Sequence, residues 1–123
     1  MTGRLPEALE TAFKQFSGLT RIPKEHLEAL WFVAEEQAER HDPADVQEAA
    51  RHALWARGDR VNGWEPGSFT ESLMITWDRA DTMNKVRLRT AFPLLTSAFE
   101  LGRNGGDEAI LAWGGIDDAR ARP

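Results

Sequence analysis

The chain lacks several residue types and patterns, and each absence removes a class of function. None of its 123 residues is cysteine, which excludes disulfides, thiolate metal ligands and cysteine nucleophiles. The first residues show no basic region followed by an apolar run, so we expect no secretion signal. No window approaches the ~20 apolar residues that a membrane-spanning helix needs. These absences predict a soluble cytoplasmic protein that does not bind a membrane.

The chain also has fewer basic than acidic residues, which affects the kind of partner that it can bind. Fifteen basic and twenty acidic residues give a net charge of −5, which argues against a general nucleic-acid binder. The charges are segregated: residues 25–48 hold eight acids and one base, Arg40, whereas residues 79–89 hold four bases and one acid, Asp81. The two stretches can pair within one chain or across a homodimer, or they can be ordinary solvated helix faces.

Tyrosine is absent, whereas tryptophan and phenylalanine are frequent. The chain has five tryptophans and six phenylalanines, and such rings fill cores or anchor partner proteins. Trp55 lies about 180° from Val46 at ~100° per residue, so its ring points away from the apolar stripe of its helix. We expect Trp55 to meet a second helix or a partner, and Trp64 to fold back from its loop onto the adjoining helices.

Strand signals are nearly absent, and helix signals recur along the chain. Apolar residues repeat at helical spacing within residues 5–16, 27–38 and 46–54. The stripe expected in the third stretch consists of Val46, Ala49, Ala50, Ala53 and Leu54. We predict an all-α fold, a compact bundle of five or six helices, as a single domain over residues 1–116. A frayed tail is expected at 117–123.

Helix boundaries in the middle of the chain are marked by capping residues and proline. Asp42 is a good N-cap residue, and Pro43 suits the first helical position. A helix over residues 78–92 is expected either to continue unbroken or to break near residues 81–84. Proline inside a helix removes a hydrogen bond and bends the axis, so we predict a kink or a restart at Pro93.

The two ends of the chain carry further helical segments. A helix is predicted over residues 6–17. The last long helix is expected to end at Gly102. A short turn at 107–113 should follow, held against the body by Trp113.

The stretch NGWEPGSFTESL, residues 62–73, combines turn residues with a capping pattern. Ser68 and Glu71 have the spacing of a capping box, in which each residue satisfies a backbone donor of the other. The helix that follows is expected to share one face among Phe69, Leu73, Thr76, Trp77 and Ala80. We interpret the stretch as the start of a helix rather than a loop that binds a ligand.

No motif for catalysis or for metal binding stands out. Glu48 and His52 form an i, i+4 pair that can place two ligands on one helix face, but no His-Glu-x-x-His motif is present. Ser68 does not lie in a Gly-x-Ser-x-Gly elbow. The glycine-rich stretches lack the spacing and the lysine of a phosphate-binding loop. We predict no catalytic residue, no metal site and no cofactor.

Asp81, Asn84 and Arg87 recur every three residues beside an apolar stripe. A polar ladder in that position is typical of a hydrogen-bond network between helices. We expect Asp81 and Asn84, with Ser68 and Glu71, to have structural roles. Asp81 and Arg87 are expected to pair with each other across the turn, or to pair with the helix that begins at Pro43.

Residues 63–93 also carry a resemblance to known sequences. The motif positions are Gly63, Pro66, Gly67, Ser68, Phe69, Thr70, Ala80, Asp81, Asn84, Arg87, Leu88, Ala91, Phe92 and Pro93. This stretch, about a quarter of the chain, resembles small, mostly uncharacterised proteins encoded by bacteriophages and prophages of high-GC bacteria. The resemblance brings no established activity. It implies a context in which small proteins bind a host or viral protein, sometimes to block a defence system.

Protein binding is the leading function class, by elimination and by aromatic content. We predict a small, non-enzymatic, phage-type accessory protein that binds another protein and forms a homodimer. The residues expected to contact partners are Trp55, Trp64, Lys85, Arg87 and Arg89. The alternative is a helical DNA-binding or regulatory protein that uses the basic 85–89 stretch. A metal-binding or enzymatic helical bundle comes third.

Overall fold

The computed structural model describes residues 24–121. They form five α-helices and one short 3₁₀ helix: α2 (Lys24–Glu39), α3 (Pro43–Ala56), α4 (Ser68–Arg79), α5 (Thr82–Ala91), α6 (Pro93–Gly114) and η1 (Ala119–Ala121). No strand occurs within these residues, and the predicted all-α bundle is confirmed. The helix predicted over residues 6–17 lies outside the described residues.

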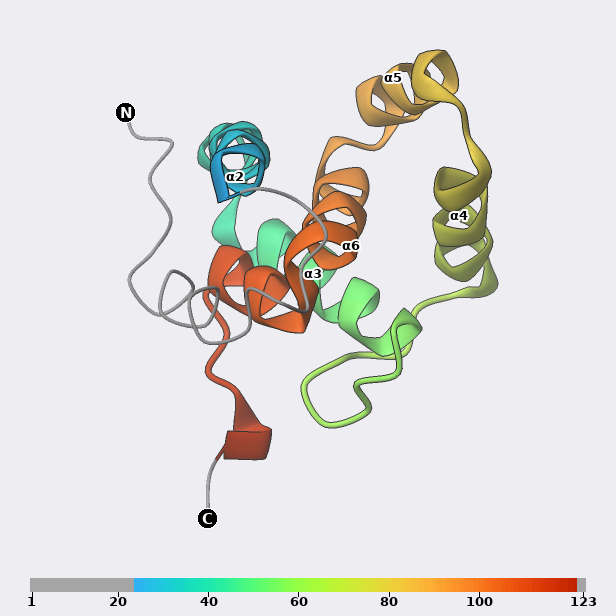
Figure 1. Cartoon of the computed structure of the whole chain (residues 1–123). Helices are drawn as coiled ribbons and strands as arrows, with labels where there is room; N and C mark the ends of the chain where they lie inside the picture. The colour runs from blue at the N-terminus through green and yellow to red at the C-terminus, as the bar shows by residue number, and fades with distance from the viewer. Residues whose placement is uncertain (1–23, 122–123) are drawn as a thin grey trace.

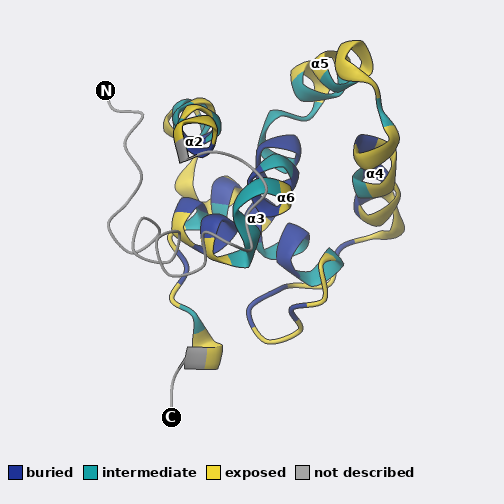
Figure 2. Cartoon of the chain, in the orientation of Figure 1, coloured by how far each residue is buried: buried dark blue, intermediate teal, exposed yellow. Residues whose placement is uncertain are grey.

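The helices divide into a body and an arm (Figure 1). α2, α3 and α6 pack closely and form the body. α4 and α5, residues 68–91, extend from it, and we refer to them as the arm. Figure 2 shows that buried residues concentrate in α3 and α6, whereas α4 and α5 are mostly exposed.

α3 forms as the sequence predicts, and it packs along α6 in the body. Asp42 is the N-cap residue, and its Oδ1 accepts a 2.8 Å hydrogen bond from the backbone N–H of Ala44. All five residues of the predicted stripe, Val46, Ala49, Ala50, Ala53 and Leu54, are buried. Their small side chains let α6 approach closely. A Cβ atom at Gly114 would lie only 2.6 Å from the Cβ atom of Ala50.

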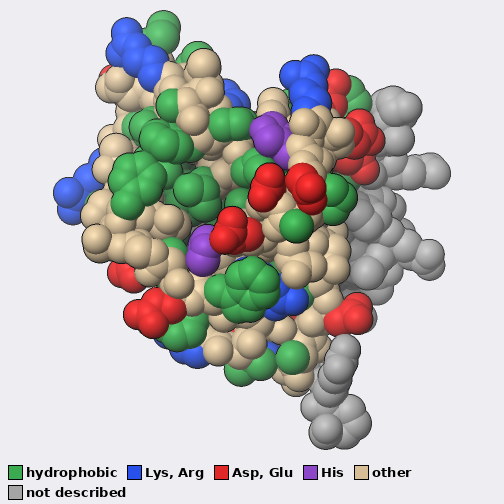
Figure 3. Space-filling model, turned by 180° about the vertical axis from the view of Figure 1, so that it is seen from behind, with side chains coloured by type: hydrophobic (Ala, Val, Ile, Leu, Met, Phe, Trp, Pro, Cys, Tyr) green, Lys and Arg blue, Asp and Glu red, His purple; other side chains and the backbone are tan. Residues whose placement is uncertain are grey.

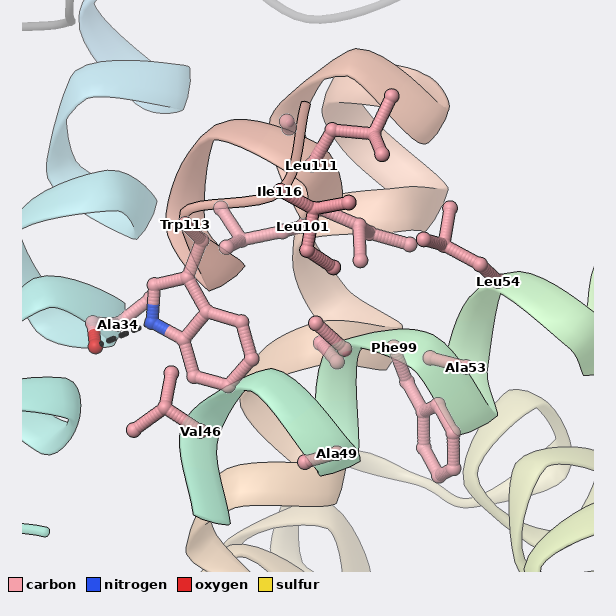
Figure 4. Packing of buried hydrophobic residues seen from close by; sticks show 14 of the residues in the cluster. Ala34, Val46, Ala49, Ala53, Leu54, Phe99, Leu101, Leu111, Trp113 and Ile116 are labelled. Carbon is pink, nitrogen blue, oxygen red and sulfur yellow. Dashed lines mark hydrogen bonds between the residues drawn. The ribbon is translucent and has the colours of Figure 1, made fainter. Parts of the chain in front are cut away.

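The core joins α2, α3 and α6 through apolar packing and one buried hydrogen bond (Figure 4). Trp113 is buried, and its Nε1–H donates a 2.7 Å hydrogen bond to the backbone oxygen of Ala34 in α2. The prediction that Trp113 attaches the C-terminal part of the chain to the body is confirmed. Leu54 and Leu101 are completely buried. Burial of such a side chain stabilises the fold by ~1.5–3 kcal/mol.

The predicted restart at Pro93 is confirmed. Phe92 leaves the helical region with φ −133° and ψ 66°, and α6 begins at Pro93. The backbone N–H of Phe92 still bonds to the carbonyl of Leu88 at 2.8 Å. The chain therefore ends one helix and begins the next at the proline, whose missing donor costs nothing at a first helical position.

The prediction that the long helix ends at Gly102 is wrong. The helical backbone continues past Gly102 and breaks at Gly106, where φ is 76° and ψ is −174°. Gly102 is buried, and a Cβ atom there would lie 2.8 Å from Cδ1 of Ile110. This glycine therefore permits close packing, while Gly106 supplies the backbone conformation that interrupts the helix.

The structure shows a break before α5, which is one of the two outcomes expected there, but the predicted start of α4 needs correction. Asp81 is the N-cap residue of α5, and its Oδ1 accepts from the backbone N–H of Asn84 at 2.8 Å. At α4 the N-cap residue is Gly67, and no side chain caps the helix. Ser68 is already inside the helix, so the capping box between Ser68 and Glu71 does not form.

The buried face of α4 also differs from the predicted one. Thr70, Leu73 and Trp77 are buried, whereas Phe69 and Thr76 are exposed. The helix is therefore turned so that Thr70 rather than Phe69 faces the body. The ring of Phe69 instead lies against Phe92, with ring centroids 5.4 Å apart.

The C-terminal segment is attached to the loop that follows α3, which differs from the frayed tail expected at 117–123. Asn62 is almost completely buried, and its Nδ2 donates to Asp118 Oδ1 at 2.9 Å. Its Oδ1 accepts from the backbone N–H of Ala119 at 2.8 Å. Arg120 adds an ion pair to Asp118, with Nε and Oδ1 3.2 Å apart. Residues 122–123 lie outside the described residues.

Candidate protein-binding surface on the α4–α5 arm

A groove lies between the two helices of the arm. It is shallow, with a volume of about 360 Å³, and its lining residues are Thr76, Arg79, Ala80, Asn84, Arg87 and Leu88. We refer to these six residues as the groove. Ala80 and Leu88 supply apolar surface, while the two guanidinium groups and the amide supply hydrogen-bond donors. The volume is in the range of pockets that hold ligands or a few side chains of a partner.

The arm is attached to the body through Trp77, which is fully buried. Two basic side chains of α5 lie over its ring: Lys85 Nζ is 5.3 Å and Arg89 Cζ is 5.6 Å from the ring centroid. Arg89 also forms an ion pair with Glu100 of α6, with Nη2 and Oε1 3.7 Å apart. Lys85 and Arg89, which were expected to contact a partner, therefore contact the protein itself.

The polar ladder runs along α5 and not between helices, which corrects the expectation. Asn84 bonds to Asp81 through its backbone N–H, and its Oδ1 accepts from Arg87 Nη1 at 2.9 Å. All three residues are exposed. The ladder therefore caps α5 at its start and positions the Arg87 guanidinium at the edge of the groove.

Exposed apolar side chains are concentrated on the arm. Seven large hydrophobic side chains are exposed in the part of the chain that the structure describes, and four of them belong to α4 or α5. These four are Phe69, Ile75, Met83 and Val86, with exposed fractions between 45% and 59%. Figure 3 shows hydrophobic side chains gathered on the side where the arm lies, seen from behind. Exposed apolar surface of this kind commonly marks an interaction site.

Trp64 lies in the loop between α3 and α4, which folds back onto α3 as predicted for its ring. Its backbone N–H donates to the carbonyl of Arg51 at 3.0 Å, and the Arg51 guanidinium lies 4.8 Å from the ring centroid. His52 Nδ1 contacts the Trp64 carbonyl oxygen at 3.0 Å. Even so, 48% of Trp64 is exposed.

Trp55 is half-buried at the end of α3, under the same loop. The guanidinium of Arg60 lies 4.2 Å from its ring centroid. A Cβ atom at Gly63 would lie 2.4 Å from the backbone nitrogen of Trp55, so the loop is tightly packed there. Figure 1 places this loop and α5 at opposite ends of the molecule. The structure therefore does not bring Trp55 and Trp64 together with Lys85, Arg87 and Arg89.

The aspartates beside this loop have altered acidity. Burial by itself raises the pKa of Asp59, but hydrogen bonds from Asn62 and Val61 outweigh it and lower the pKa below its ordinary value. Hydrogen bonds from Asn62 and Arg120 lower the pKa of Asp118. Hydrogen bonding to Asp118 raises the pKa of the Arg120 guanidinium. These groups stabilise one another as charges, which is the behaviour of a structural network.

The Glu48–His52 pair considered as a metal site is present as a contact, with Oε2 and Nε2 3.7 Å apart. Among the described residues, no group of three or more histidine, aspartate or glutamate side chains is placed to hold a metal ion. None of the described helices is both long and apolar enough to cross a membrane.

Several residues of the candidate surface were not predicted from the sequence. Arg79, Ala80 and Leu88 line the groove, and Met83 and Val86 are exposed beside it. A signal was present for Val86: at ~100° per residue it lies about 160° from Leu88, so one of the two must face solvent.

Comparison with known proteins identifies no relative of this chain. No family model matches the chain, and neither a curated protein nor a solved structure matches it. The resemblance of residues 63–93 to phage proteins stays a prediction.

Proposed function

We propose that the protein is a small, non-enzymatic accessory protein of the phage type that acts by binding another protein through the arm. The observation that carries this proposal is the exposure of Phe69, Ile75, Met83 and Val86 on two short helices that extend from the body. A solvated helix face has no need of these side chains. Covering one of them in an interface contributes up to ~1.5–3 kcal/mol.

The shape of the arm supports the same proposal. Two helices joined by a short turn can present a rigid surface to a partner, and the partner's shape is then matched without reordering the chain. The Phe69–Phe92 contact and the cations over Trp77 hold the arm in one arrangement. Trp64 offers a further exposed ring at the other end of the molecule.

The alternative, a DNA-binding or regulatory protein that uses residues 85–89, has less support. Lys85 and Arg89 are half-buried over Trp77, and Arg89 also pairs with Glu100. Only Arg87 of the three is exposed. A helix that reads DNA needs several exposed polar and basic side chains on one face.

The proposal is tested by affinity capture from a host lysate with the tagged protein and a Met83→Ser/Val86→Ser variant. Both side chains are exposed, so the variant should keep its melting temperature. We expect it to lose most of the captured protein, because apolar anchors dominate binding energy. Val33→Ser/Val61→Ser is the matched control, since both valines are exposed outside the arm.

Equal recovery of partners by the arm variant and the control would contradict the proposal. A DNA-shift assay over a range of salt concentrations separates the alternative, because phosphate contacts give steep salt dependence. Tight, salt-sensitive DNA binding that requires Arg87 would favour the DNA-binding function instead.

A further inference from the structure

The groove carries positive charge that the described part of the chain does not neutralise. Arg79 and Arg87 are exposed, and neither forms an ion pair with a residue that the structure describes. By comparison, Arg57, Arg89, Arg103 and Arg120 pair with carboxylates, and Arg51 and Arg60 lie over tryptophan rings. Two guanidinium groups beside the apolar surface of Ala80 and Leu88 fit a segment that presents carboxylates and small apolar side chains together.

The helix that forms one wall of the groove is short and only partly covered. α5 has ten residues, and none of them is buried. Helices shorter than ~12–15 residues are marginal in water unless packing stabilises them. Within the chain, α5 packs through the half-buried Lys85, Leu88 and Arg89, and a cover over the groove would add to this packing. A second copy of the same chain can supply such a cover.

The chain itself presents a surface with the required chemistry. Asp42, Asp45 and Glu48 are exposed near the start of α3, and we refer to these three residues as the acidic row. Pro43 and Ala44, which are also exposed, lie between the acids and offer small apolar surface. Figure 3 shows acidic side chains gathered near the middle of the rear face, bordered by hydrophobic ones.

We propose that the protein forms a two-fold dimer in which the groove of each copy holds the acidic row of the other. Arg79 and Arg87 bind the carboxylates of Asp45 and Glu48, and Leu88 contacts the apolar residues between the acids. Two-fold symmetry places this contact twice in each dimer. The dimer also covers the groove side of α5, while Met83 and Val86 lie outside the groove.

The dimer is tested by charge reversal and its rescue. Sedimentation velocity over a range of protein concentrations gives the dissociation constant of the unmodified protein. Arg79→Glu/Arg87→Glu and, separately, Asp45→Arg/Glu48→Arg should each weaken the dimer by at least ~30-fold, because each leaves like charges opposed. An equimolar mixture of the two variants should restore dimers, all of them containing one copy of each.

Two controls exclude misfolding and a general effect of charge as explanations of this result. Circular dichroism must show that each variant keeps the helix content of the unmodified protein. Glu25→Arg/Glu108→Arg makes the same charge change as the acidic-row variant, on two acids that are exposed elsewhere, and should leave the dimer intact.

The dimer proposal is overturned if the unmodified protein sediments as a monomer at all concentrations. It is also overturned if mixing the reversed variants fails to restore dimers. Neither result affects the proposed partner binding, which is measured with Met83 and Val86. A monomer whose capture of host protein still depends on those two residues leaves the proposed function standing.

Discussion

At the scale of single residues, Asn62 connects parts of the chain that are far apart in sequence. Its amide donates to Asp59 and to Asp118, and it accepts from the backbone of Ala119. Each of these bonds uses a different lone pair or proton of one side chain. The loop that presents Trp64 therefore depends on one buried amide.

We expect Asn62→Ala to lower the free energy of unfolding by ~2–3 kcal/mol, because it removes donors from two carboxylates and leaves polar groups without partners. Urea unfolding followed by tryptophan fluorescence measures the change. Asn104→Ala is the matched control, since the hydrogen bonds of Asn104 within residues 24–121 go to Glu100 of the same helix. A loss no greater than that of the control would show that the Asn62 network does not hold the loop.

Acidity at the same network gives a prediction with a definite sign. The pKa values of Asp59 and Asp118 are lower in the folded protein than their ordinary values. The unfolded chain therefore binds more protons in acid, so this stability is present above the ordinary carboxyl pKa and is lost as the pH falls through the folded pKa values. We expect the free energy of unfolding to fall steadily below about pH 4.

The Asn62→Ala variant separates this effect from general acid unfolding. Because Asn62 supplies hydrogen bonds that lower both pKa values, the variant should lose less stability than the unmodified protein between neutral pH and acid. Parallel curves for the two proteins would mean that the pKa shifts do not arise at this network.

At the scale of secondary structure, local sequence determined some helices and not others. α3 could be predicted in full, because its N-cap, its first-turn proline and its stripe agree. The orientation of α4 could not, since both Phe69 and Thr70 give an acceptable apolar face. Contacts with the body decide between them by burying Trp77 completely.

The break inside α6 gives a prediction about backbone geometry. Gly106 has φ 76° and ψ −174°, a conformation that only glycine adopts without strain. We expect Gly106→Ala to destabilise the protein by ~1–3 kcal/mol, as measured by thermal and urea unfolding.

Gly67→Ser is the informative comparison for Gly106→Ala. Gly67 is the N-cap residue of α4, its backbone is extended, and a Cβ atom there would have no neighbour within 4 Å. Serine can supply the missing capping oxygen, so this variant should be neutral or slightly stabilising, by a few tenths of a kcal/mol. If Gly106→Ala is tolerated equally well, the chain does not need a glycine at that break.

At the scale of the whole molecule, the bundle could be predicted but the functional surface could not. Hydrophobic spacing identifies the core face of a helix and located the stripe of α3, while the proline located the restart at Pro93. The groove forms where α4 and α5 meet, and the sequence of neither helix predicts how the two pack against each other. The attachment of Asp118 to Asn62 joins residues 56 positions apart, and the charged tail gave no sign of it.

The same limit applies to the basic residues, whose surroundings could not be predicted from the sequence. Lys85, Arg87 and Arg89 form one cluster in sequence, but a helix distributes them over different directions. Lys85 and Arg89 lie over Trp77, and Arg87 lies at the groove with Arg79. The sequence therefore shows one basic stretch. In the fold, Lys85 and Arg89 lie over Trp77, whereas Arg87 is exposed.

The proposed function requires that the arm's apolar side chains bind a protein and do not stabilise the fold. The most direct measurement compares the Met83→Ser/Val86→Ser variant with the unmodified protein for melting temperature and for recovery of host proteins in the same preparation. We predict an unchanged melting temperature and a loss of captured protein. A lowered melting temperature with undiminished capture would contradict the claim.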